Sequence, residues 1–280
     1  MRTRAATRAC DNHPYRNEDT YFATDSGGLG VFDGLGGHVG SEQAAAIASR
    51  VVESALNSIE RSLHPLEAEG RLRESLYLAH RAIVAKQLES HNNIATTAVI
   101  AQLFESTLSD MMYLGIAHAG DSRAYILRDG RFVYTTLDHS LTTAQESERE
   151  QRRVQSMISS AHYLDEIDPY DWRHVSQRNY IDSCLGGRGH VKIAATHLPV
   201  LSGDVVLLTS DGIHDNLTDL EIRNTLSRYA LVAPDELVNR AYERSREPRE
   251  VRVAIGGEQF NRTAFRPKPD DMTAVVRLIE

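Results

Sequence analysis

Four aspartates lie at the ends of short apolar stretches, and most of them sit beside glycine. Asp33 and Asp211 each follow an apolar run and precede a glycine, Asp121 follows Gly120, and Asp270 directly precedes the last apolar run. Strand ends are rigid positions, and glycine lets the backbone and a ligand approach closely. Carboxylates gathered at one end of a sheet repel each other unless cations offset their charge. The pattern therefore predicts strands that end at a shared metal site.

The chemistry of these side chains indicates which ions the site would take. All-oxygen ligands favour Mg²⁺ or Mn²⁺ over zinc. Cys10 and Cys184 lie far apart and match no metal-ligand spacing, which indicates a reducing, cytosolic compartment. The glycines of 34–37 lack the lysine and the spacing of a nucleotide-binding loop. A single Asp-Gly is most often a turn, so each motif alone leaves the function open.

Hydrophobic periodicity predicts many short strands with helices between them. A hairpin is expected over 19–33, and helices are expected from Ser41 and over 71–89. The capping box Thr218–Glu221 and the early Pro234 open two late helices. Further strands are expected at 97–103, 111–119, 122–127, 132–136, 191–197, 204–209 and 273–279. Residues 246–269 are expected to form a long loop. Two central and two late helices among many strands suggest sheets between helical layers.

The segment 142–180 differs from the rest, because it is polar and charged, with few apolar residues in its first half. We expect it to be a surface excursion, or flap. Arg149, Arg152 and Arg153 either contact a phosphopeptide there or lie on a solvated helix face.

Composition narrows the class of protein. The net charge of −8 argues against a nucleic-acid partner, which usually requires a basic patch. The apolar runs are too short to cross a bilayer, and no signal segment follows the first residues, so we expect a cytoplasmic protein without a membrane partner. An acidic chain also suits a protein that concentrates carboxylates around metal ions.

The order of the motifs resembles that of the type 2C, metal-dependent protein phosphatase (PPM) family. The resemblance runs from residue 17 nearly to the end of the chain, in the family's order. It rests on the strings NED (17–19), VFDGLGGH (31–38), TTA (96–98), HAGDSRAY (118–125), DHSL (138–141), LTSDGI (208–213) and DDMT (270–273).

The resemblance implies one domain over 1–280 with an α+β fold, a four-layer αββα sandwich of two antiparallel sheets flanked by helices. It also implies two divalent cations, Mn²⁺ or Mg²⁺, with a weaker third. Asp33 would bridge both ions, the Gly34 carbonyl would bind one of them, and Asp211 and Asp270 would hold the first. The implied ligands of the second ion are Glu18 and Asp19, and those of the third are Asp121, Asp211 and, as in some relatives, Asp215.

A hydroxide bridging the two ions would attack the phosphorus of phosphoserine or phosphothreonine, so that Asp33 and Asp211 act through metal-bound water. The implied partner is a phosphorylated protein, the substrate of a serine/threonine kinase, and the chain is expected to be a monomer. A small phosphate ester or an anti-sigma-factor antagonist is the remaining substrate alternative.

Four positions depart from the family pattern, and two of them, His118 and Ala95, have no functional account. Pro14 stands where an arginine usually grips the substrate phosphate, and Arg16 or Arg8 are the candidates to replace it. Leu35 stands where animal members of the family carry a histidine, and compact bacterial members also have an apolar residue at this position. His38 is either a loop residue or a general acid. The departure at Pro14 motivates an alternative function, a pseudophosphatase that acts as a binding module.

Overall fold

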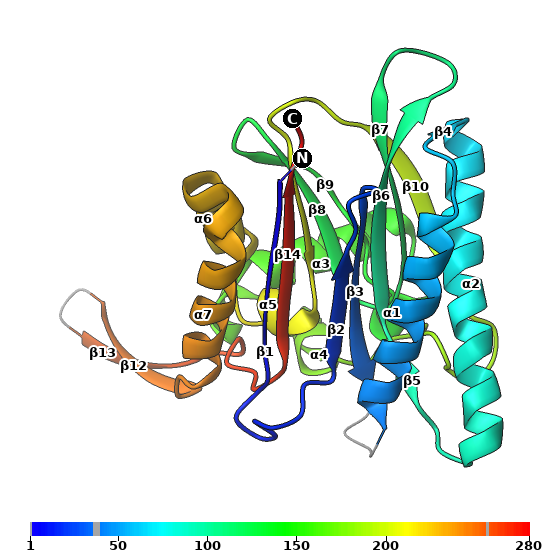
Figure 1. Ribbon diagram of the computed structural model, residues 1–280. Helices are drawn as coiled ribbons and strands as arrows, with labels where there is room; N and C mark the ends of the chain where they lie inside the picture. Colours follow the sequence, from blue (N-terminus) through cyan, green and yellow to red (C-terminus); the bar gives the residue numbers. More distant parts are fainter. Residues whose placement is uncertain (1, 36–39, 256–257) are drawn as a thin grey trace.

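Two sheets lie face to face with helices on both outer faces, as the computed structural model shows for residues 2–35, 40–255 and 258–280 (Figure 1). The five-stranded sheet has the order β1–β14–β11–β8–β9, and its strands are β1 (Arg2–Arg8), β8 (Arg123–Arg128), β9 (Arg131–Thr135), β11 (Val205–Thr209) and β14 (Met272–Leu278). The seven-stranded sheet follows β10–β7–β6–β3–β2, and its strands are β2 (Asp19–Ala23), β3 (Gly28–Leu35), β4 (Ser62–Leu63), β5 (Ala95–Thr96), β6 (Ala98–Ser106), β7 (Met112–Ala119) and β10 (Ala194–Pro199). Every pairing in these two sheets is antiparallel except the short one between β4 and β6. The predicted αββα sandwich is confirmed.

The alternation of side chains along each strand builds the layers. Val206 and Leu208 of β11 pack in the core between the sheets, whereas Leu207 packs against the outer helices. On β3, Val31 belongs to the core between the sheets and Phe32 to the helix-covered core. Both faces of each central strand are therefore buried, which explains why these strands are apolar throughout rather than alternating with polar residues.

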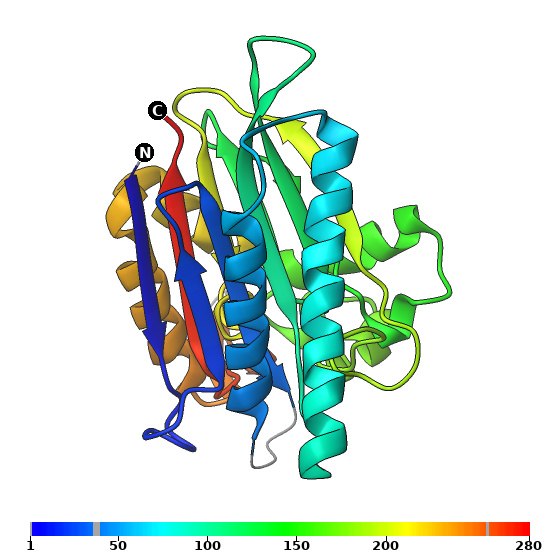
Figure 2. The same cartoon turned by 45° about the vertical axis from the view of Figure 1, so that its right-hand side comes forward.

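Four long helices cover the sheets. Helices α1 (Ser41–Asn57) and α2 (Pro65–Ser90) pack on the seven-stranded sheet, and α6 (Asp219–Tyr229) and α7 (Ala233–Ser245) on the five-stranded sheet (Figures 1 and 2). The predicted capping box is confirmed: Thr218 accepts from the Glu221 N–H at 3.2 Å, and Glu221 accepts from the Thr218 N–H at 2.8 Å.

Two helix starts differ from the prediction. Helix α1 is capped by Gly40, whose φ of 116° favours glycine, and Ser41 is its first residue. Helix α2 begins at Pro65 rather than at residue 71, because the His64 side chain accepts a hydrogen bond from the Leu66 N–H and proline suits a first helical turn.

The flap contains α3 (Glu148–Ser160) and α4 (Trp172–Ser176) and buries more than its polar sequence indicated. Four side chains form a small core of its own with the chain after β13 (Glu258–Thr263): Ala161, Ile167, Val175 and Phe265. Arg152 pairs with Glu148, and Arg153 pairs with Glu150 and Asp171. Both guanidinium groups therefore already have acidic partners on the flap itself.

Two strand-forming segments longer than two residues were not predicted. The expected loop at 246–269 contains a hairpin, β12 (Glu250–Ile255) with β13, and β1 pairs along its whole length with β14. Neither segment has a continuous apolar run, because β1 lies at a sheet edge and β12–β13 forms a separate two-stranded sheet. Their strand character comes from pairing rather than from a buried face.

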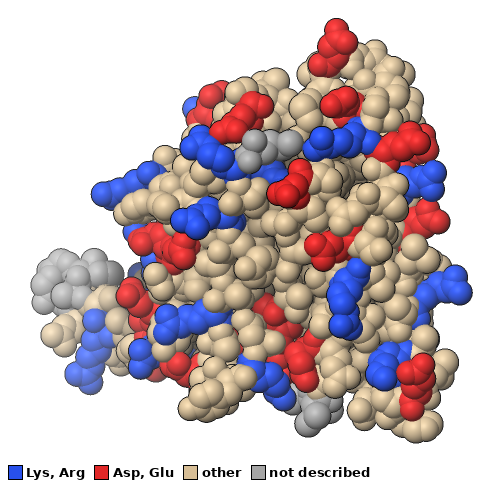
Figure 3. All heavy atoms as spheres, viewed as in Figure 1, with Lys and Arg blue, Asp and Glu red and all other residues tan. Residues whose placement is uncertain are grey.

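One face of the molecule is mixed in charge. On the face drawn in Figure 3, acidic and basic side chains alternate over the visible residues. Within the ranges the structure describes, no helix is both long and apolar enough to span a bilayer.

Candidate metal centre

The hairpin β2–β3 positions the first carboxylates. Its register sets Asp19 opposite Asp33, and the Gly34 N–H donates to the Glu18 carbonyl at 3.2 Å. All three acidic side chains are buried. A side chain at position 34 would place its Cβ 2.6 Å from the Ser41 carbonyl oxygen, so this close packing of β3 against α1 requires glycine.

The other predicted ligands come from the ends of neighbouring strands. Asp211 follows β11 and begins the short helix α5 (Asp211–His214), Asp121 follows β7, and Asp270 precedes β14. The Gly212 backbone lies so close to the Asp271 carbonyl that a Cβ would come within 1.9 Å of its oxygen. The glycine after Asp211 therefore lets the ends of β11 and β14 meet, and both sheets contribute carboxylates to one end of the sandwich.

The pKa of Asp33 shows how closely these charges gather. Burial, and then the carboxylates of Asp211, Asp19, Asp270 and Asp121, raises the pKa of Asp33 well above its usual range. The pKa of Asp121 is raised by burial and by Asp211, and the pKa of Asp19 by burial. Burial raises the pKa of Asp211 to about 7. Each of these pKa values is raised mainly because burial disfavours the charged carboxylate, and the neighbouring carboxylates add to the effect.

The oxygens of this cluster fit a divalent cation. One oxygen each of Asp19, Asp121 and Asp211 is buried and has no hydrogen-bond partner among the residues that the structure describes. An unpaired buried carboxylate oxygen is costly unless it binds a cation. Because the donors are all oxygens, the hard ions Mg²⁺ and Mn²⁺ suit them best.

Lys268 was missed by the sequence interpretation. Its ammonium binds the Asp211 carboxylate and lies 3.0 Å from both Asp215 and Asp270. Although burial lowers it, the three carboxylates hold the pKa of Lys268 well above its usual value, so the side chain is charged. Lys268 lies in the segment 246–269, which was predicted to be a loop. Its position two residues before Asp270 was the only feature of the sequence that could have indicated a place in the site.

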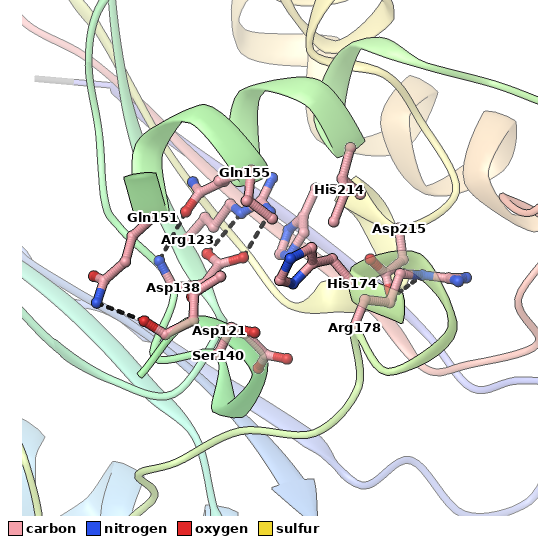
Figure 4. A pocket seen from close by; sticks show the side chains of 13 residues that line it. Asp121, Arg123, Asp138, Ser140, Gln151, Gln155, His174, Arg178, His214 and Asp215 are labelled. Atoms are coloured by element: carbon pink, nitrogen blue, oxygen red, sulfur yellow. Dashed lines mark hydrogen bonds and ion pairs between the residues drawn. The ribbon is translucent and has the colours of Figure 1, made fainter. Parts of the chain in front are cut away.

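Asp121 and Asp215 border a small polar cavity under the flap. Its volume of about 30 Å³ is enough for one or two water molecules. Figure 4 shows Asp215 beside Arg178 on one side, and Gln151 and Gln155 of α3 on the other. Despite burial, Lys268 and Arg178 lower the pKa of Asp215, which keeps this carboxylate ionised next to the cavity.

Hydrogen bonds from neighbouring residues fix the ligand set. The Ser210 hydroxyl donates to Asp19 at 2.6 Å and accepts from the Thr273 N–H at 2.9 Å, which joins the two sheets at the site. The Thr96 hydroxyl and the Thr97 N–H both donate to the Asp33 carbonyl at 2.8 Å. The threonine pair belonged to the quoted motifs, but Ser210 had no assigned role, because only the tertiary structure brings it to Asp19.

The two arginines considered as replacements for the family's phosphate-binding arginine differ in their contacts. Arg16 Nη2 lies 2.8 Å from Glu18 Oε1, so the guanidinium reaches the rim of the cluster and pairs with a predicted ligand. The Arg8 guanidinium stacks 3.3 Å from the centroid of the Tyr242 ring. His38, with Gly36 and Gly37, lies outside the described residues.

Two facing antiparallel sheets that gather buried carboxylates at one end, with one oxygen each of Asp19, Asp121 and Asp211 lacking a hydrogen-bond partner among the described residues, are the arrangement expected of a metal-dependent hydrolase. The family model described as protein phosphatase 2C matches residues 11–159, which is more than half of the 280 residues. The chain therefore belongs to the protein phosphatase 2C family, and it is a phosphatase of that type.

Individual relatives agree with this assignment. A protein named serine/threonine phosphatase stp from Listeria welshimeri is 28% identical over 198 residues, which is 70% of each chain. A protein named serine/threonine protein phosphatase PstP from Mycobacterium tuberculosis is 31% identical over 215 residues, which is 75% of this chain and 36% of that protein. A solved structure of the PstP catalytic domain with two manganese ions aligns with a TM-score of 0.68 and 22% identity, covering 100% of this chain and 98% of that one.

Proposed function

We propose that this chain hydrolyses phosphoserine and phosphothreonine in proteins by attack of a hydroxide that bridges two divalent cations. The observation that carries the proposal is the set of unpaired, buried oxygens of Asp19, Asp121 and Asp211 around the raised-pKa carboxyl of Asp33. Family membership and the names of the two relatives support the substrate class.

The roles of the residues follow from their positions. Asp33 would bridge the ions, with the Gly34 carbonyl as a further ligand, and Asp211 and Asp270 would hold the first. Glu18 and Asp19 would serve the second, and Asp121 with Asp211 and Asp215 would hold a weaker third. When bound by these residues, the ions would supply an activated water and positive charge to offset the phosphoryl oxygens. Manganese or magnesium suits this set, and the relative with two manganese ions supports the choice.

The residues of the chain itself position the proposed ligands. Ser210 orients Asp19, and the threonine pair fixes the Asp33 backbone. Arg16, at the rim, would turn from Glu18 to the substrate phosphate, since a guanidinium pairs well with phosphate oxygens.

We place this activity in the cytoplasm, acting on the products of a serine/threonine kinase, with residues 1–280 working as one monomeric domain. The free thiols of Cys10 and Cys184 support a reducing compartment. The binding-module alternative gains no support, because every predicted carboxylate ligand is present and gathered at one end of the sandwich.

The test is hydrolysis of p-nitrophenyl phosphate and of a phosphothreonine peptide with Mn²⁺, with Mg²⁺ or with EDTA. We expect metal-dependent turnover that is lost in Asp33→Asn and in Asp211→Asn. The matched control is Asp110→Asn, which changes an exposed turn residue and should keep full activity. Full activity in both centre variants would overturn the metal assignment.

A further inference from the structure

A second group of metal-binding side chains lies beside the carboxylate centre. Cys10 and His13 lie on the segment between β1 and β2, and Asp271 directly precedes β14. One ligand atom from each residue can be chosen so that all three lie within 4.8 Å of one another. Cys10 and Asp271 are buried, and His13 is half-buried. No role has been assigned to this group by the function proposed above.

The imidazole of His13 is oriented as metal-binding histidines are. Its Nδ1 lies 2.7 Å from the Arg16 carbonyl oxygen. Because a carbonyl can only accept, Nδ1 carries the proton and Nε2 presents its lone pair. A backbone carbonyl on the other ring nitrogen is the usual outer partner of a metal-bound histidine. The tautomer that a metal needs is thus already set.

The distance between the first two donors fits one ion. Cys10 Sγ lies 3.3 Å from His13 Nε2. Zinc binds sulfur at about 2.3 Å and nitrogen at about 2.0–2.1 Å, so two such ligands of one tetrahedral ion lie roughly 3.5 Å apart. Without an ion, the thiol proton can bridge the same two atoms.

Asp271 is held rigidly at the third position. Its Oδ1 accepts from the Cys10 N–H at 2.8 Å, and its Oδ2 accepts from the Glu18 N–H at 2.5 Å. Oδ1 also lies 3.6 Å from His13 Nδ1. A carboxylate has about four lone-pair positions, so these bonds leave capacity for a cation. The buried carboxylate is therefore preorganised next to the thiol and the imidazole.

We propose that Cys10, His13 and Asp271 bind a zinc ion, with water as the fourth ligand, at a site separate from the carboxylate centre. A thiolate and an imidazole select zinc over the hard ions Mg²⁺ and Mn²⁺. Binding releases the Cys10 thiol proton to solvent, and the thiolate, the neutral imidazole and the carboxylate then hold the ion. The site also links the segment before β2 to the start of β14.

The chemistry of the Cys10 thiol distinguishes a metal site from a catalytic or redox-sensing cysteine. Burial raises the pKa of the Cys10 thiol, whereas an activated nucleophile or redox sensor needs a lowered one. No spacing pattern along the chain indicates this site, because the third ligand lies 261 residues from Cys10. Folding alone brings the three donors together.

Cobalt substitution under reducing conditions tests the proposal on the full chain. Co²⁺ bound to a thiolate gives a sulfur-to-metal charge-transfer band, which the all-oxygen centre cannot produce. We expect the band to saturate at one equivalent and to disappear when Zn²⁺ is added. Asp211→Asn, which damages the carboxylate centre, should keep the band, so a failure of the proposed phosphatase function would leave this result unchanged.

The two free cysteines provide matched variants. Cys10→Ser should abolish the band and Cys184→Ser should keep it, with circular dichroism confirming that both are folded. His13→Gln, at a partly exposed position, should weaken zinc binding by more than the roughly 10–100-fold that loss of an outer partner costs. No band in the wild-type chain would overturn the proposal, as would a band that survives Cys10→Ser or unchanged zinc affinity in His13→Gln.

Discussion

The Nζ atom of Lys268 lies 3.0 Å from the Asp270 carboxylate, and the same ammonium also contacts Asp211 and Asp215. A cation of the protein itself therefore stands on the carboxylates proposed to bind the first and third ions. A divalent ion that binds there has to displace this ammonium from at least part of its contacts.

Replacing this lysine should tighten metal binding. In Lys268→Met the ion meets the same carboxylates without a competing charge, so we expect the Kd for Mn²⁺ to fall by about tenfold, or about 1.4 kcal/mol. With a chelator present, the variant should unfold at a lower temperature than the wild-type chain, because the buried carboxylates lose their positively charged partner. Titration calorimetry and thermal unfolding measure the two effects. Lys86→Met, which removes a surface lysine, is the control, and an unchanged Kd in Lys268→Met would contradict the competition.

The raised pKa of Asp211 makes the metal-free protein sensitive to pH. The pKa rises from 3.8 to about 7 on folding, so the folded state binds a proton that the unfolded chain releases. The free energy of unfolding in chelator should therefore fall as pH rises through this interval, by up to about 1.4 kcal/mol per pH unit for one group. Denaturant unfolding at several pH values measures the slope. Asp211→Asn should flatten it while Asp110→Asn leaves it unchanged, and equal slopes in all three proteins would refute the linkage.

Ser210 is expected to support both the fold and the second ion. In Ser210→Ala, Asp19 loses its donor and the Thr273 N–H loses its acceptor, which should cost about 1–3 kcal/mol of stability. We also expect weaker binding of one of the two ions, because the Asp19 carboxylate is no longer held in place. Urea unfolding and manganese titration test this, with the exposed Ser109→Ala as control. If Ser210→Ala is as stable as the control, the hydrogen bonds of Ser210 to Asp19 and Thr273 do not contribute to the free energy of unfolding.

Restoring the family arginine should strengthen substrate binding. Pro14→Arg places a guanidinium where the family pattern expects one, and a hydrogen bond to a charged group is worth about 1.5–3 kcal/mol. We expect the KM for a phosphopeptide to fall about tenfold with little change in kcat, since ground and transition states carry the same phosphate charge. Tyr15→Arg adds the same charge at the neighbouring, fully exposed position and should have no such effect. A KM that falls equally in both variants would indicate general charge attraction instead.

The sequence was a good guide where local chemistry decides the structure. Apolar runs buried on both faces became the central strands, such as β3 with Val31 and β11 with Val206. The glycines after Asp33 and Asp211 mark positions where backbones meet closely, as the expected strand ends required. The capping box at Thr218 marks a real helix start.

Features that depend on distant partners could not be predicted. Strand β1 and the hairpin β12–β13 show no buried side chain among the residues whose burial is described, so no local pattern identifies them. Lys268, Ser210 and Cys10 each contact a carboxylate that lies far away in the sequence: Asp211, Asp19 and Asp271, respectively. The flap was misjudged for the same reason, since Phe265, from another part of the chain, completes its small core.

The pairing of β1 with β14 has a further consequence for engineering. Arg2 lies opposite Leu278, and the two ends of the chain emerge together at the end of the sandwich away from the loop that joins β1 to β2 (Figure 1). A short linker between them would close the backbone into a ring without crossing the carboxylate centre. The exposed turn between β6 and β7, around Leu108, then offers a place to open that ring as a circular permutant.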